Sequence, residues 1–85
     1  MNEVALMWEV RVVPGEQHRL LDWAREHAVP AVRAAGCRDV RLYRSEQQRV
    51  VLIAHFAAAE APVLPEPPPH LAARPPHQWT FDRVL

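Results

Sequence analysis

The sequence has one cysteine, Cys37, so no disulfide can form within the chain. No Cys–His cluster has the spacing of a structural zinc site. With 85 residues, the chain suffices for one domain with a thin core. Domains of this size that lack disulfides and metals commonly gain buried surface by pairing. We therefore expect a single domain, residues 1–85, that forms a homodimer.

Lysine is absent, and ten arginines balance ten acidic residues, which gives a formal net charge of zero. Because no run of basic residues occurs, a nucleic-acid partner is not expected. Apolar runs such as Val50 to Ala54 are at most five residues long, too short to cross a membrane. The amino-terminal residues lack the basic and apolar regions of a signal peptide, so the expected location is the cytoplasm.

The segment from Val4 to Val13 alternates between two sets of side chains, as a strand does. One set contains Leu6, Trp8, Val10 and Val12, and the other contains Met7, Glu9, Arg11 and Val13. Pro14-Gly15 ends this strand. Further strands are expected at Asp39 to Arg44, Arg49 to Phe56 and Gln78 to Leu85, and Ala57 to Glu60 suits a short helical turn.

Between the first two strands, Glu16 to Ala35 has the apolar spacing of a helix that ends at Gly36. The expected inner face consists of Leu20, Ala24, His27, Ala31 and Ala35, flanked by Trp23 and Ala28. Pro30 lacks a backbone N–H and clashes with the carbonyl of Glu26, so a kink or break is expected there.

Seven prolines lie between Pro62 and Pro76, which excludes a helix over that segment. Since a strand follows it, the segment is expected to be ordered and to cross the domain in place of a second helix. The resulting order predicts an α+β fold with a ferredoxin-like antiparallel sheet. In it, the third strand lies beside the first, and the fourth lies on the first strand's free edge.

One helix leaves the second sheet face uncovered, and that face carries Met7, Val13, Val51 and Ile53. An exposed apolar patch of this kind favours two sheets that face one another. The motifs agree with this architecture: Val10 to Gly15, the helix that contains Pro30, Gly36 to Arg44, and Val50 to Ala54. Over residues 4–56 the sequence resembles the antibiotic biosynthesis monooxygenase family of the dimeric α+β barrel superfamily. After Phe56 it departs from that family, because the second helix is missing.

The resemblance implies a pocket between helix and sheet that accepts a flat aromatic or polyketide-type molecule. Some members of the family oxidise such molecules with molecular oxygen and no added cofactor, so no cofactor is expected. Two alternatives stay open. One is a cofactor-free cyclase, isomerase or lyase with a histidine base, and the other is a non-catalytic dimeric module that holds a ligand or stabilises a partner.

His27 and His55 are the candidate catalytic residues, each as a general base. His27 follows Trp23 by one helical turn, and His55 is in phase with Val51 and Ile53 on the expected barrel face. There His55 is expected to pair with Glu9 or Arg11. The structural alternative is a packed histidine at position 27 and a purely structural ion pair at position 55.

The candidate substrate-binding residues are aromatic or polar side chains near the expected pocket: Trp8, Trp23, Tyr43, Arg11 and His70. The structural alternative is that the tryptophans pack in the core and the other side chains are exposed to solvent. No metal site is expected, because no nearby acid completes a ligand set with His70 and His77. The ligand is predicted to lie near His27, Trp23 and Trp8, beneath a lid formed by the proline-rich segment.

Overall fold

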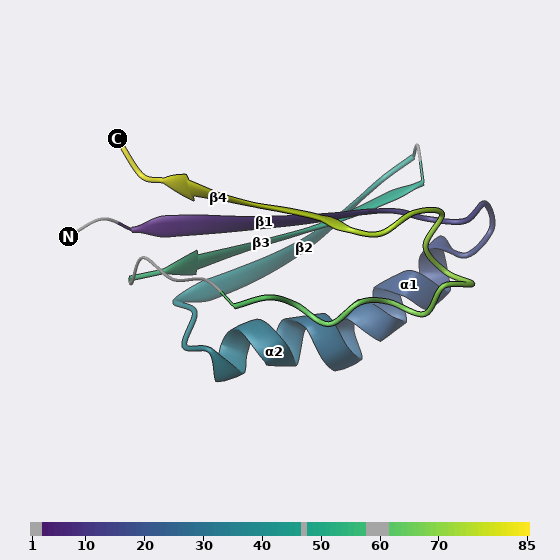
Figure 1. The fold of residues 1–85 in the computed structure, drawn as a ribbon, viewed down its shortest axis with the longest axis horizontal. Helices are drawn as coiled ribbons and strands as arrows, with labels where there is room; N and C mark the ends of the chain where they lie inside the picture. The colour runs from purple at the N-terminus through teal and green to yellow at the C-terminus, as the bar shows by residue number, and fades with distance from the viewer. Residues whose placement is uncertain (1–2, 47, 58–61) are drawn as a thin grey trace.

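A four-stranded antiparallel sheet, covered on one face, makes up the fold (Figure 1). The computed structural model describes residues 3–46, 48–57 and 62–85. Its elements follow the chain in this order: β1 (Val4–Arg11), α1 (Gln17–Trp23), the π-helix η1 (Ala24–Ala28), α2 (Val29–Ala34), β2 (Asp39–Ser45), β3 (Arg49–Phe56) and β4 (His77–Asp82). The helical turn expected at Ala57 to Glu60 falls, except for Ala57, outside the described residues.

The strand order is β2-β3-β1-β4, and every neighbouring pair is antiparallel. This is the order that the sequence predicts, with β3 beside β1 and β4 on the free edge of β1. In the central pair, Trp8 lies opposite Leu52 and Val10 lies opposite Val50. The predicted fold class is therefore confirmed: an α+β, ferredoxin-like sheet with one main helix.

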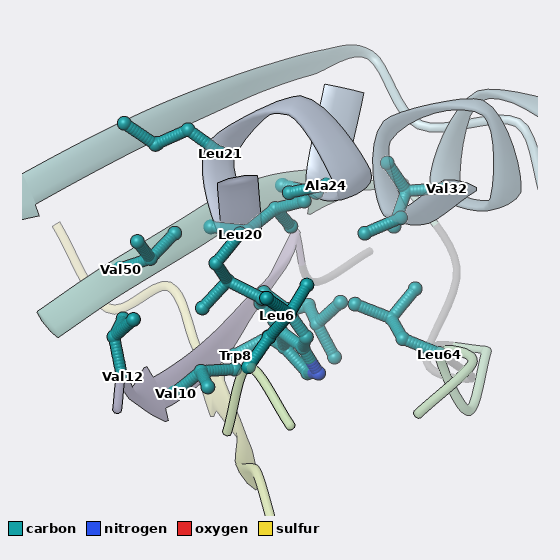
Figure 2. Close-up of a cluster of buried hydrophobic side chains, with 14 of the residues drawn as sticks. Leu6, Trp8, Val10, Val12, Leu20, Leu21, Ala24, Val32, Val50 and Leu64 are labelled. Atoms are coloured by element: carbon teal, nitrogen blue, oxygen red, sulfur yellow. The ribbon is translucent and has the colours of Figure 1, made fainter. Parts of the chain in front are cut away.

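Alternate residues of β1 and β3 fill the core on the helix side of the sheet. The fully buried side chains include Leu6, Trp8 and Val10 of β1 and Val50 and Leu52 of β3. Figure 2 shows Leu6, Trp8, Val10 and Val50 of this set together with Leu20 of the helix, and Leu64 of the proline-rich segment belongs to the same cluster. Because successive side chains of a strand point to opposite faces, the burial of this set leaves the other set on the uncovered face.

The helix runs without a break from Gln17 to Ala34, so the irregularity expected at Pro30 takes the form of a π turn. Within that turn, the N–H of Val29 donates to the carbonyl of Ala24. A wider turn before Pro30 accommodates a residue that has no N–H and needs room at the preceding carbonyls.

The π turn also corrects the predicted inner face of the helix. The buried residues after Leu20 are Ala24, Ala28 and Val32, whereas His27 and Ala35 are exposed. A regular helix of 3.6 residues per turn would rotate residues spaced by four away from one line. The extra residue in the π turn offsets this rotation, so the four-residue spacing stays on the sheet.

The proline-rich segment, Pro62–Pro76, packs on the same side of the sheet as the helix (Figure 1). Leu64, Pro67 and Leu71 are buried. The backbone N–H of Val13 donates to the carbonyl of Leu71, at 2.9 Å. The segment therefore replaces the missing second helix, as expected.

Replacing Leu52 with alanine tests this core. Leu52 is fully buried, so the truncation should lower the free energy of unfolding by about 2–5 kcal/mol. Urea denaturation followed by circular dichroism measures the change. Val63 is 90% exposed, and its replacement by alanine should change stability by less than about 0.5 kcal/mol. Equal losses in the two variants would contradict this packing.

Candidate functional site

The second face of the sheet has no covering element among the described residues (Figure 1). Strand register places its side chains in rows that cross all four strands. One row contains Asp39, His55, Ala5 and Phe81; the next contains Arg41, Ile53, Met7 and Trp79; the third contains Tyr43, Val51, Glu9 and His77. We call this surface the open face.

The middle of the open face is apolar. Met7 and Ile53 lie side by side on the two central strands, and Val51 follows in the next row. Beside Met7 lies Trp79, which is 42% exposed, and Phe81 is 53% exposed. Exposed aromatic side chains next to aliphatic ones form the kind of patch that marks a binding surface.

At one end of the open face, an open hollow of about 530 Å³ crosses the first row. It is lined by Glu3, Ala5, Arg38, Asp39, His55, Phe81, Asp82 and Arg83. Ala5 is the smallest side chain of its row and lies between His55 and Phe81. Space is therefore left between an aromatic wall and a titratable ring.

His55 and Asp39 form a close pair on one side of the hollow, with Nδ1 and Oδ1 2.7 Å apart. An ionised carboxylate only accepts hydrogen bonds, so Nδ1 of His55 carries the hydrogen. In the neutral form of the ring, the other nitrogen, Nε2, then holds a lone pair, and no hydrogen bond to it is found among the described residues. A carboxylate that fixes a histidine tautomer in this way prepares Nε2 to accept a proton.

The predicted partners of His55 were wrong. The sequence pattern correctly places His55 on the same face as Glu9 and Arg11, but it does not give the register. His55 lies opposite Ala5 on β1 and opposite Asp39 on β2. Glu9 lies two rows away and pairs with Arg49, at 3.5 Å.

Ion pairs surround the hollow. Glu3 accepts a hydrogen bond of 2.9 Å from Arg83 and lies 3.7 Å from Arg38. Asp39 lies 3.6 Å from Nε of Arg41 as well as against His55. Opposite charges thus balance at the rim, while the floor at Ala5 and the wall at Phe81 are apolar.

The other predicted site near the helix is an aromatic stack. Trp8 is 1% exposed in the core, and its ring centroid lies 6.2 Å from that of Trp23. Trp23 in turn stacks on the exposed ring of His27, with centroids 5.3 Å apart. The sequence correctly brings these three residues together. None of them lines the hollow beside Ala5.

The remaining predicted site residues lie apart from one another. Tyr43 is 46% exposed in the third row of the open face, and Arg11 is exposed at the end of β1. His70 is exposed within the proline-rich segment, whose neighbouring Leu71 is buried in the core. Sequence reasoning missed Asp39 and Phe81 as site residues. The alternation of β2 and β4 showed their faces, but only the register brings them to His55.

Within residues 3–46, 48–57 and 62–85, no group of three or more His, Cys, Asp or Glu side chains could hold a metal ion. The helices of the described residues are also not long and apolar enough to cross a membrane.

No protein-family model matches the chain, and no curated protein matches it either. Two solved structures share its fold. One is named "Putative antibiotic biosynthesis monooxygenase" and comes from Bordetella bronchiseptica; it has a TM-score of 0.73 and 19% sequence identity, and all of both chains is covered. The other is a protein of unknown function from Nitrosomonas europaea, with a TM-score of 0.72, 14% identity, and coverage of 100% of this chain and 92% of that one.

The Asp39–His55 pair predicts a fixed histidine tautomer. Once the ring is neutral, ¹⁵N NMR should show hydrogen on Nδ1 of His55. Asp39→Ala removes the acceptor, so this preference should disappear, while the signals of exposed His70 stay unchanged. An Nε2-protonated ring in the unmodified protein would contradict the pair.

Proposed function

We propose that this chain is a homodimeric small-molecule enzyme of the cofactor-independent monooxygenase type, with a flat aromatic or polyketide-type substrate and His55 as its base. The observation that carries the proposal is the Asp39–His55 pair, set in a hollow whose opposite wall is Phe81. Its fold, shared with the structure named "Putative antibiotic biosynthesis monooxygenase", supports this choice of reaction class.

Pairing of two copies is supported by the open face. Its apolar middle includes Met7, Ile53 and Trp79, and a partially exposed tryptophan in such a position is typical of interfaces. The polar groups at its ends, such as the Glu9–Arg49 pair, suit the rim of an interface. Two open faces in contact would enclose the hollow beside His55 and exclude water from it.

The proposed chemistry begins with proton removal. Nε2 of His55 takes a proton from an acidic C–H or phenolic O–H of the substrate, and Asp39 stabilises the imidazolium that forms. The electron-rich substrate anion then reacts with molecular oxygen. When a CH₂ group becomes a carbonyl, one oxygen atom enters the product and the other leaves as water with the two hydrogens. Phe81 provides a flat surface on which an aromatic ring can stack.

A cyclase, isomerase or lyase would use the same base without oxygen. The Asp39–His55 pair supports this second candidate equally well, since proton transfer opens both reactions. Oxygen consumption separates the two. A non-catalytic ligand-binding dimer remains the third candidate, and it requires binding without any product.

Turnover tests the assignment of the base. With an anthrone-like phenolic probe, an oxygen electrode should record uptake, and mass spectrometry should find a product 14 mass units heavier, about the mass of one oxygen less two hydrogens. His55→Gln should lower kcat by about 10²–10⁴-fold because it removes the base. His27→Ala, a control on the helix side, should keep most of the activity. If His27→Ala loses activity and His55→Gln keeps it, the active site lies at the stack of Trp8, Trp23 and His27 instead.

The dimer has its own test. Light scattering at micromolar concentration should give about twice the chain mass. A buried charge without a partner is costly, so Met7→Glu should produce monomers. Val63→Glu adds the same charge at a position that is 90% exposed outside the open face, and this variant should remain dimeric. A monomeric unmodified protein would contradict the barrel arrangement.

A further inference from the structure

A second hollow lies on the helix side of the sheet, along the outer edge of β2. It measures about 690 Å³ and is lined by His18, Leu21, Arg25, Val29, Arg33, Val40, Leu42, Tyr43 and Arg44. We call it the β2 groove. Its lining combines four aliphatic side chains with three arginines, and no carboxylate of the described residues belongs to it.

The arginines of the β2 groove are incompletely neutralised. Arg25 lies 3.2 Å from Asp22, which also lies 3.6 Å from His18. Neither Arg33 nor Arg44 has an ion-pair partner among the described residues. The groove therefore carries excess positive charge in a protein whose formal net charge is zero.

The positive charge is distributed along the groove instead of gathered at one end. On the helix it extends from Arg25 to Arg33, which corresponds to about 12 Å at 1.5 Å per residue. On β2 it is represented by Arg44, four residues beyond Val40. A molecule with one anionic head would pair with only some of these arginines, whereas a peptide with several carboxylates could pair with all of them.

The edge of β2 adds backbone hydrogen-bonding groups. β2 is an outer strand of the sheet, and in the part of the chain that the structure describes its one partner strand is β3. An outer strand has backbone groups on its unpaired side that can pair with an added strand. The aliphatic floor, which includes half-buried Val40 and Leu42, offers contacts for the apolar side chains of that strand.

We propose that the β2 groove binds an extended, acidic segment of a partner protein, which adds to β2 as a fifth strand. Every second side chain of the segment faces the groove. In that set, acidic side chains pair with Arg33, Arg44 and Arg25, and apolar side chains between them rest on Val40 and Leu42. Apart from Tyr43, which belongs to the open face, the residues that line the groove lie on the opposite side of the sheet from His55, and none of them lines the hollow beside His55. The interaction does not rest on the proposed activity.

A pair of synthetic peptides tests the proposal with the full chain. One is a short acetylated peptide long enough to span β2, in which Val and Glu alternate on one face and Thr occupies every position of the other face (the Val–Glu peptide); in the second, Lys replaces Glu (the Val–Lys peptide). Fluorescence polarisation up to about 1 mM should detect binding of the Val–Glu peptide only. Added salt should weaken this binding by screening the ion pairs. Hydrogen exchange should show new protection at the β2 amides that point away from β3.

The double variant Arg33→Glu, Arg44→Glu should lose about tenfold or more in affinity for the Val–Glu peptide and gain affinity for the Val–Lys peptide. Arg74→Glu changes an exposed arginine outside the groove and should leave affinity within about twofold. Circular dichroism checks that each variant is folded.

The proposal is overturned if the Val–Glu peptide does not bind. It is also overturned if Arg74→Glu lowers the affinity for this peptide as much as the double variant Arg33→Glu, Arg44→Glu does. Binding without new protection in β2 would also overturn it, because the peptide would then not be an added strand. Dodecanoate serves as a probe with a single anionic head. If it binds through Arg33 and Arg44 while the peptide does not, the groove accepts a small amphipathic anion instead.

Discussion

The alternation of side chains between the two faces of the sheet decides which residues form the core and which remain on the surface. β1 and β3 alternate strictly, so burial of Trp8 and Leu52 on one face places Met7 and Ile53 on the other. The chain has one helix and one proline-rich segment to cover the sheet, and both lie on the same side (Figure 1). Because none of the described elements covers the second face, its apolar rows are available for a ligand and for another copy of the chain.

On the covered face, a short chain builds a buried core from one helix and the proline-rich segment. A π turn ahead of Pro30 keeps Ala24, Ala28 and Val32 on the sheet, and small side chains there let the helix approach closely. Leu64 and Leu71 add buried area from a segment that cannot form a helix interior. The tryptophan stack from Trp8 to Trp23 belongs to this packing, which connects the core to the surface at His27.

Charge is arranged differently on the two sides of the sheet. On the open face, acids and bases alternate at short distances, as in the pairs Asp39–His55 and Glu9–Arg49. Such pairs orient side chains and leave little net field, which suits a site for a neutral or weakly acidic aromatic molecule. In the β2 groove, arginines outnumber their partners, which favours an anionic ligand. One small domain thus offers two chemically different surfaces.

The sequence by itself determined the secondary structure and the strand order, because period-two alternation, helical spacing and the right-handed crossover rule are local or nearly local properties. It also determined that His55 shares a face with Ile53 and that the proline-rich segment has to return to the sheet. Only the tertiary structure decided that Asp39 is the partner of His55, since pairing depends on strand register, and a shift of the register would change every cross-strand neighbour. Likewise, the exposure of His27 follows from the π turn before Pro30, which keeps Ala24 and Ala28 buried against the sheet. Regular helical periodicity does not contain that displacement.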